Sequence, residues 1–377
     1  MSKKNKILLA IIIGSFAIAI ILVYFFSNNK KNIPTDNTDQ NSDKQSTLSV
    51  EKIADQIMLF PAISPDGEKL FYFSDANSQF FSFNLKTKES IALSERLEIL
   101  PEQIWWSPQR DKVIVRFTYN KAVAEKFEGP FADLNMADND NAVWLYDLLN
   151  KKASRLSSNI ENIAWSPDGS KIIYHYVDFE NNFDNIAIAN PDGSSWRKLA
   201  DVSYPLGAKL GFISSEKVFY YQYTGSEKEE IAPTQKTEIM IADIETNKTE
   251  KILDAESATG IVFPNNNNSL AIYERIKDDS FSLGIFDLEK KEVKDLDFYA
   301  DLDRITILNS KLIAISIDNE KNIIHSIDLK TGAKNQIMTN KPLPLSVDDW
   351  LFDQEQGIVY FTSGYYPYRI NLTKDNL

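Results

Sequence analysis

No cysteine occurs in the 377 residues, and histidine occurs only twice. The absence of cysteine excludes disulfide bonds and thiol chemistry, although a large hydrophobic core needs no such cross-links. The two histidines, His175 and His325, lie far apart in strand-like contexts, and no Gly-x-Ser-x-Gly motif accompanies them. These absences exclude a Ser-His-Asp hydrolase and a metal centre built from several histidines. Each histidine is expected to make a local hydrogen bond within its strand.

Basic residues are scarce beyond the N-terminal end. Residues 1–31 contain five lysines and no acidic residue, so the remainder carries 36 basic against 54 acidic residues. A domain this acidic is repelled by phosphate backbones. We therefore expect no nucleic-acid binding.

One hydrophobic run is long enough to cross a membrane. Ile7–Phe26 holds 20 residues without a charge, which as a helix spans about 30 Å of bilayer. It lacks a small-residue cleavage site, and three lysines precede it against two that follow. We expect residues 1–6 to be a cytoplasmic head and residues 7–26 a retained transmembrane anchor. Residues 27–46 are then a flexible linker, and residues 47–377 lie outside the cytoplasm, in a periplasm or on the cell surface.

A recurring phrase begins after the linker: an apolar strand, a polar turn and a second apolar strand. It is clearest at Ile163–Tyr176, where Ser166-Pro-Asp-Gly169 supplies the turn. Proline there sets φ, aspartate bonds its own backbone, and glycine accepts a positive φ. The phrase occurs seven times at steps of 43 to 59 residues, with these turn-leading residues: Ser64, Ser107, Ser166, Ser214, Pro264, Asn309 and Asp353.

Each repeat also contains later strands. A third strand ends in Asp-Leu, Asn-Leu or a near variant, and in six repeats a fourth strand follows. Four strands in about 40–50 residues is typical of a β-propeller blade. The seventh repeat has only five residues after Leu372, so residues near Thr47–Val50 are expected to complete it and close the ring. The predicted fold is all-β, a seven-bladed β-propeller. Six blades are the alternative, because the fourth and sixth repeats have degraded turns.

The phrase Ile163–Tyr174 resembles the repeat of TolB-type propellers, a WD-like repeat related to the propeller domains of prolyl-oligopeptidase-type enzymes. Pro61–Phe73 matches nearly as well, and Ile104–Phe117 keeps Trp-Ser-Pro but replaces Asp-Gly with Gln109-Arg110. The resemblance covers roughly residues 47–374 and implies the propeller fold. It implies little about activity, because such propellers serve as scaffolds, binding platforms and enzyme gates.

Acidic residues offer the remaining routes to chemistry. Asp138-Asn-Asp-Asn141 is the best local candidate for calcium, but it lacks the glycine and the spaced glutamate of a hand-type loop. We therefore assign no metal and no cofactor. The pairs Asp278-Asp279, Asp301/Asp303 and Asp348-Asp349 could act as glycosidase carboxylates only if the fold brings two of them together.

Two tryptophans occupy the repeated apolar position just before a turn. Trp106 and Trp165 could stack on a sugar, but this position predicts packing between blades instead. Trp105, Trp144, Trp196 and Trp350 have no clear assignment from the repeat.

The connections between second and third strands are extended in three consecutive repeats, at Asn120–Asn141, Asp178–Asp184 and Thr224–Thr237. In a blade this connection lies on the same rim as the link to the next blade, so the insertions should meet on one sector of one face. Loops on a rigid scaffold often carry binding function, although plain surface loops are the alternative. Apolar side chains in these insertions are the candidate partner contacts: Phe127, Phe131, Met136, Phe179 and Phe183.

Together these features predict a membrane-anchored, extracytoplasmic propeller that is not an enzyme. We expect it to be a scaffold that binds an envelope protein or polymer. Two alternatives are a carbohydrate-active or calcium-dependent enzyme with acids converging at the central channel, and a self-associating structural protein of the cell surface.

Overall fold

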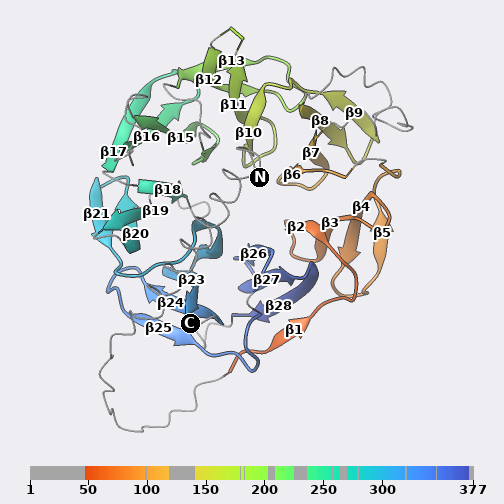
Figure 1. Ribbon diagram of the computed structural model, residues 1–377, viewed down its shortest axis with the longest axis vertical. Helices are drawn as coiled ribbons and strands as arrows, with labels where there is room; N and C mark the ends of the chain where they lie inside the picture. Colours follow the sequence, from red (N-terminus) through yellow and green to blue (C-terminus); the bar gives the residue numbers. More distant parts are fainter. Residues whose placement is uncertain are drawn as a thin grey trace, which may run out of the picture. The chain divides into compact units, whose positions relative to one another are not determined.

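Seven four-stranded antiparallel sheets follow one another around a ring (Figure 1). The computed structural model describes residues 47–372 apart from 98–99, 119–140, 179, 182, 203–208, 225–235, 256–257, 264–269, 278–279, 319–320 and 345. This part of the chain is an all-β, seven-bladed β-propeller, as the repeats predict. The six-bladed alternative is wrong.

The first four blades each run outward from the centre of the ring to its rim. Their strands are β2 (Leu59–Ile63), β3 (Lys69–Ser74), β4 (Gln79–Asn84) and β5 (Ser90–Ala92); β6 (Gln103–Trp106), β7 (Lys112–Thr118), β8 (Asn141–Asp147) and β9 (Lys152–Arg155); β10 (Ile160–Trp165), β11 (Ile172–Asp178), β12 (Phe183–Ala189) and β13 (Arg197–Asp201); and β14 (Leu210–Phe212), β15 (Lys217–Thr224), β16 (Lys236–Asp243) and β17 (Thr249–Ala255).

The last three blades repeat the same order, except that the seventh ends in the first strand of the chain. Their strands are β18 (Ala258–Val262), β19 (Leu270–Lys277), β20 (Ser280–Asp287) and β21 (Glu292–Asp295); β22 (Ile305–Leu308), β23 (Lys311–Asp318), β24 (Lys321–Asp328) and β25 (Lys334–Ile337); and β26 (Asp349–Asp353), β27 (Ile358–Ser363), β28 (Tyr366–Asn371) and β1 (Val50–Lys52).

The ring is closed by β1, which pairs antiparallel with β28 and places Val50 opposite Ile370. Just before this strand, Leu48 is 5% exposed. Its N–H donates to the carbonyl of Met338 (2.8 Å), and its carbonyl accepts from the N–H of Asn340 (2.7 Å). The prediction that residues near Thr47–Val50 complete the seventh blade is confirmed, with the paired strand itself beginning at Val50.

The serine-led turns between first and second strands are held by their own side chains. Ser166 Oγ donates to Asp168 Oδ1 (2.6 Å) and accepts from the N–H of Lys171 (2.9 Å). Gly169 follows with φ 72°, a left-handed conformation that glycine adopts without a steric cost. The turn therefore forms as the Ser-Pro-Asp-Gly phrase predicts.

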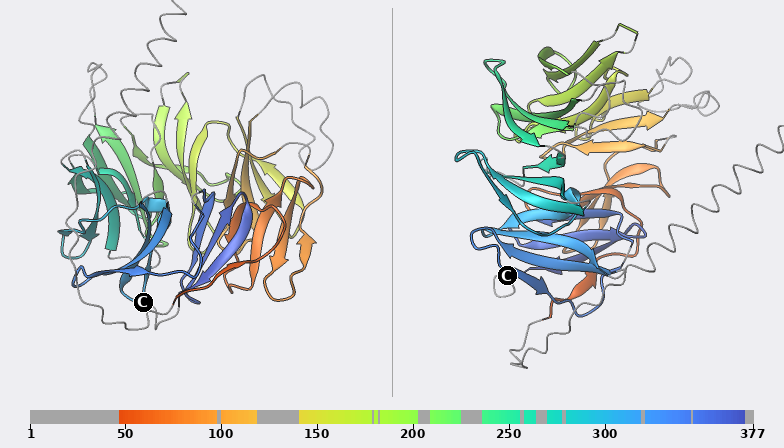
Figure 2. Two further views of the ribbon diagram at one scale, coloured as in Figure 1. Left: turned by 60° about the horizontal axis from the view of Figure 1, so that its bottom comes forward. Right: turned by 60° about the vertical axis from the view of Figure 1, so that its left-hand side comes forward.

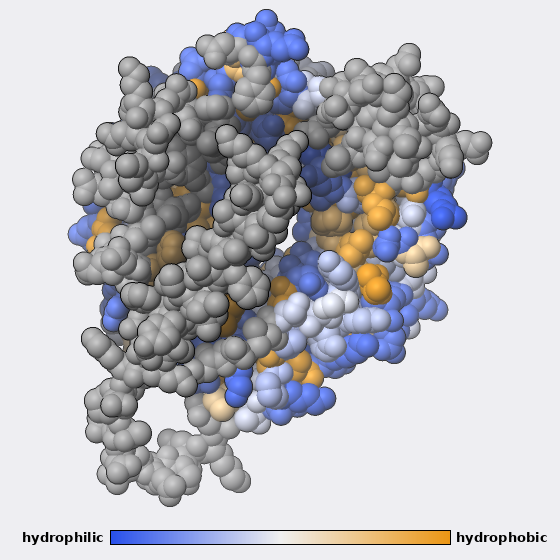
Figure 3. Space-filling model, in the orientation of Figure 1, coloured by the Kyte–Doolittle hydropathy of each residue, from blue (hydrophilic) through white to orange (hydrophobic). Residues whose placement is uncertain are grey.

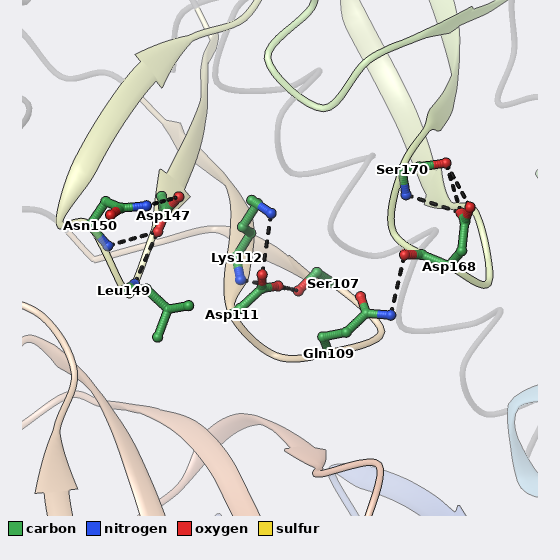
Figure 4. Close-up of polar contacts among 9 residues, drawn as sticks. All are labelled: Ser107, Gln109, Asp111, Lys112, Asp147, Leu149, Asn150, Asp168 and Ser170. Atoms are coloured by element: carbon green, nitrogen blue, oxygen red, sulfur yellow. Dashed lines mark hydrogen bonds and ion pairs between the residues drawn. The ribbon is translucent and has the colours of Figure 1, made fainter.

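The second blade builds the same turn from different residues (Figure 4). Ser107 Oγ donates to Asp111 Oδ1 (2.9 Å), and Arg110 takes the glycine position with φ 61°. Gln109 is thereby free to reach the next blade, where its Nε2 donates to the carbonyl of Asp168 (3.2 Å). The departure from the repeat thus creates a contact between blades.

The turns between third and fourth strands begin with a polar side chain that bonds the backbone ahead of it. Asp147 Oδ1 accepts from the N–H of Leu149 (3.0 Å) and of Asn150 (2.8 Å), as Figure 4 shows. The same pair of bonds occurs at Asn84, Asp287 and Asp328. The predicted turn-starting role of these residues is confirmed.

The core lies between the blades. In the described chain, a cluster of buried apolar side chains fills each of the seven spaces between neighbouring sheets. Trp106 Nε1 donates to the carbonyl of Phe60 in the preceding blade (2.8 Å), and Trp165 Nε1 donates to the carbonyl of Trp105 (3.0 Å). The prediction that Trp106 and Trp165 pack between blades is confirmed.

The two faces of the ring carry different connections (Figure 2). Because the strands alternate in direction, one face holds the two kinds of turn just described. The other holds the connections between second and third strands and the links between blades. Where Figure 3 shows the described residues, hydrophilic side chains predominate and hydrophobic side chains gather in a few patches.

The predicted head, anchor and linker, residues 1–46, lie outside the described residues. Within the part that is described, no helix has the length and hydrophobicity needed to cross a membrane. The helix found there is the short 3-10 turn η1 (Leu302–Arg304).

Candidate functional site

A groove of about 480 Å³ opens beside the third blade, next to the link that comes from the second blade. Tyr176 of β11 lies opposite Asn185 of β12. Since side chains alternate along a strand, every second residue of both strands faces this groove. We call it the aromatic groove, and its lining residues are Leu156, Ser157, Ile160, Tyr174, Tyr176, Asp178, Asn181, Phe183, Asn185, Ala187, Gly193 and Trp196.

Four aromatic side chains give the groove its character. Tyr174 is buried at the base, within the cluster that packs between the second and third blades, and burial raises the pKa of its hydroxyl to about 12. Tyr176 meets Phe183 edge-on, with ring centroids 6.4 Å apart. Phe183 is 43% exposed and Trp196 is 57% exposed. The groove therefore offers open aromatic surface on a rigid sheet.

One buried amide faces the groove without a partner. Asn185 is 1% exposed, and neither its Oδ1 nor its Nδ2 forms a hydrogen bond within the described chain. A buried polar group left in this state costs about 1–3 kcal/mol. Such a group needs an explanation, and the recognised ones are stored strain, a functional role and a bound water or ion.

The polar rim of the groove is negatively charged. Asp178 accepts from Asn181 through Nδ2 (2.8 Å) and the backbone N–H (3.1 Å). These bonds lower the pKa of the Asp178 carboxyl, so it is ionised at neutral pH. In the link from the second blade, Asn159 Nδ2 donates to the hydroxyl of Tyr176 (3.2 Å).

Only one of the five residues predicted as partner contacts can be placed. Phe183 lies in the aromatic groove, whereas Phe127, Phe131, Met136 and Phe179 lie outside the described residues. Sequence reasoning missed Asn185 and left Trp196 unassigned. The available signal was strand alternation, which puts Asn185 on the same face as Phe183 once both are assigned to one strand.

Two of the acidic pairs lie on neighbouring blades. Asp303 belongs to η1 before the sixth blade, and Asp349 begins β26 of the seventh. Burial raises the pKa of the Asp349 carboxyl, with smaller contributions from the charges of Asp348 and Asp303. The pair Asp278-Asp279 and the stretch 138–140 lie outside the described residues. Among the residues that are described, no group of three or more acidic, histidine or cysteine side chains could hold a metal ion.

Both histidines make local hydrogen bonds in separate blades, as predicted. His175 is fully buried, and its Nε2 lies 2.5 Å from Asp184 Oδ1 on the adjacent strand. His325 Nε2 lies 2.9 Å from Ser316 Oγ. Burial lowers the pKa of His325, and nearby Lys334 lowers it further.

No protein-family model and no curated protein matches this sequence. Solved structures do match. An oligogalacturonate lyase in complex with manganese is 11% identical, with a TM-score of 0.58 over 87% of this chain and 91% of that one. The propeller domain of the Trilobed protease from Pyrococcus furiosus is 14% identical, with a TM-score of 0.53 over 86% and 95%. TolB from Acinetobacter baumannii is 15% identical, with a TM-score of 0.44 over 91% and 86%.

The likeness is one of fold. At these identities the matches to the lyase and to the Trilobed protease domain show that the chain shares their propeller architecture, and they assign the chain to no family. Function must therefore be argued from the site.

Proposed function

We propose that this protein is a membrane-anchored, extracytoplasmic propeller whose aromatic groove binds a protein or polymer of the cell envelope. In this proposal residues 7–26 are the anchor and residues 27–46 the linker, as the sequence predicts. Binding, rather than catalysis, is the proposed activity.

One combination of side chains carries the proposal. Phe183 and Trp196 expose aromatic surface in the same groove as the unpaired, buried amide of Asn185. Ligand sites are typically apolar clefts with a few convergent polar groups, and aromatic anchors supply much of the binding energy at interfaces. The aromatic groove has both features.

The binding role is tested with the full chain, solubilised in detergent and mixed with insoluble envelope material from its native cell. We expect the protein to sediment with this material, and Trp196→Ala to reduce the sedimented fraction at least about fivefold. Leu149→Ala is the matched control, because Leu149 is 77% exposed in a turn of the second blade and lies outside the groove.

The side of the membrane on which the propeller lies is tested in the same native cells. Protease added outside intact spheroplasts should digest the propeller, because the proposal puts residues 47–377 beyond the cytoplasmic membrane. A protected propeller would overturn the orientation. Equal sedimentation of wild-type protein and Trp196→Ala would overturn the groove as the binding site.

A further inference from the structure

Asn185 defines the hydrogen bonds that a ligand of the aromatic groove must offer. Its backbone lies between two strands, opposite Tyr176 in β11 and Asp201 in β13, so the point from which the side chain projects is fixed by the sheet. The amide presents an acceptor, Oδ1, beside a donor group, Nδ2. Because both atoms are buried and unpaired, a ligand with an adjacent donor and acceptor would satisfy both at once.

The aromatic side chains define the shape of the ligand. Phe183 and Trp196 expose large parts of their rings, and Phe183 is braced by its edge-on contact with Tyr176. Aromatic faces carry negative potential and attract C–H groups. A pyranose ring has C–H groups on its faces and neighbouring hydroxyls on its edge, and these hydroxyls are an adjacent donor and acceptor.

The charge of the groove disfavours an acidic ligand. None of the twelve described lining residues is a lysine or an arginine, and one of them, Asp178, is an aspartate. The carboxylate of Asp178 is stabilised in its ionised form by Asn181. An anionic sugar or a phosphate would be repelled here without a compensating cation.

The strand arrangement disfavours a peptide. Peptides commonly bind by adding a strand to an exposed sheet edge. Here β11 lies between β10 and β12, and β12 lies between β11 and β13, so the strands that line the groove have no free edge. These two strands can therefore offer a ligand only their side chains, which suits stacking and hydroxyl hydrogen bonds.

We infer that the aromatic groove binds an uncharged saccharide, with a sugar ring against Phe183 or Trp196 and its hydroxyl or acetamido groups on the Asn185 amide. This inference rests on the proposed binding role and adds the ligand class. The volume of about 480 Å³ lies within the range of small-molecule sites, about 300–1,000 Å³, and therefore suits a short oligosaccharide or the end of a chain.

The test is a calorimetric titration, in which the heat of binding is measured as each probe is added to the full chain in lipid nanodiscs. The probes are triacetylchitotriose, cellotriose and maltotriose as neutral trisaccharides, trigalacturonate as the acidic one, and tetraalanine as a peptide. We expect a neutral trisaccharide to bind, and Trp196→Ala and Asn185→Leu each to weaken its binding about tenfold or more. Phe281→Ala is the control, since Phe281 is 48% exposed on the fifth blade beside Tyr299.

Asn185→Leu also has a readout that a purely structural role would not produce. Leucine is of similar size and removes the unpaired amide, so this variant should unfold at the same temperature as the wild type or a higher one while losing the sugar. A lower unfolding temperature would mean that the amide supports the fold, and would overturn its assignment to the ligand.

The inference is overturned if only trigalacturonate or tetraalanine binds, or if no neutral trisaccharide binds. In that case, sedimentation with envelope material that still depends on Trp196 would preserve the proposed binding role with another ligand class. If sedimentation is independent of Trp196 as well, both proposals fall.

Discussion

Two interfaces between blades use the same clasp. At the groove interface, between the second and third blades, Gln109 Nε2 donates to the carbonyl of Asp168 (3.2 Å). At the closing interface, between the seventh and first blades, Gln356 Nε2 donates to the carbonyl of Asp66 (3.0 Å). In both, the acceptor precedes a glycine with positive φ. The two glutamines stand at different positions in their turns, and Gln354, which directly follows the turn-leading Asp353, donates to Thr306 instead. The clasp therefore depends on reaching the carbonyl before the glycine of the next blade.

The two interfaces differ in the cavity that lies beside the clasp. The groove interface leaves the aromatic groove open, with its unpaired amide. The closing interface has a cavity of about 600 Å³ lined by charged and polar residues, among them Asp66, Glu68, Lys86 and Arg369. Beside it, Arg369 pairs with Glu51 of β1 (2.8 Å). The closing interface is thus secured by a strand from the other end of the chain, whereas the groove interface has no such added strand among the described residues.

The largest expected effect comes from removing that strand. Deleting residues 47–52 from the full chain exposes the edge of β28 and removes the buried side chain of Leu48. We expect a loss of at least about 3 kcal/mol in the free energy of unfolding, measured by urea denaturation. Deleting residues 36–41 of the predicted linker is the control, and equal midpoints for the two deletions would contradict closure by β1.

The second-largest expected effect is the loss of stability when alanine replaces Gly67 or Gly169, the glycines that follow the two acceptor carbonyls. A Cβ at position 67 would lie 2.0 Å from Gln356 Nε2 and 2.4 Å from Asp353 Oδ2, whereas at position 169 the nearest atom is Gln109 Oε1 at 2.5 Å. Both also adopt left-handed φ. We expect Gly67→Ala to cost about 3 kcal/mol and Gly169→Ala about 2 kcal/mol in urea denaturation.

Adding Gln109→Ala to Gly169→Ala separates the two causes of that cost. The second substitution removes the atom that the new Cβ would meet, so only the backbone strain should remain. Gln109→Ala alone is measured as well, because it removes the clasp. If Gly169→Ala costs as much in the Gln109→Ala background as in the wild type, the close approach of Gln109 contributes nothing to the cost of the alanine.

Most of the architecture followed from local chemistry. The turn phrase, the polar residue that ends each third strand and the missing fourth strand of the seventh repeat were enough to predict the ring and its closure. These features depend on neighbours within a few residues. The sequence also marked Gln109-Arg110 as a departure, but its use as a clasp depends on how close the next blade lies, which no local pattern reports.

The candidate site was predicted only in part. Phe183 was singled out because the sequence predicted it within an extended connection. That placement is wrong, because Phe183 pairs with Asp178 and begins β12, where it lines the aromatic groove. Asn185 could be given a face by strand alternation, yet only the packing between two blades decides whether that face meets a neighbour or a groove. Trp196 lies in the turn between β12 and β13, and its position depends on the left-handed φ of Ser195. The surroundings of Asn185 and the position of Trp196 therefore become known only from the folded structure.

The smallest expected effect is a pH-dependent contribution to stability from Asp168 and Asp66, whose carbonyls accept the two clasps. Hydrogen bonds from Ser166 Oγ and then from the backbone N–H of Ser170 lower the pKa of the Asp168 carboxyl. Asp66 in the first blade has its pKa lowered in the same way, by Ser64 Oγ and the N–H of Glu68. A lowered folded-state pKa stabilises the fold above the unfolded-state pKa, about 3.9, and this contribution is lost as the pH falls through the folded-state pKa.

Asp168→Asn should therefore cost some stability at neutral pH, no more than about 1 kcal/mol because the carboxyl is exposed to solvent. The cost should fade in acid. Asp66→Asn should show the same trend with a smaller cost, since Asp66 shares the serine hydroxyl and backbone N–H donors but lacks the bonds that Ser170 Oγ makes to Asp168. Urea denaturation at several pH values measures both. Gln109→Ala removes a clasp but no ionisable group, so its cost should not change over the same interval. If the cost of Asp168→Asn is also constant from about pH 7 to about pH 2, the carboxylate charge plays no part, and the turn is held by geometry that asparagine reproduces.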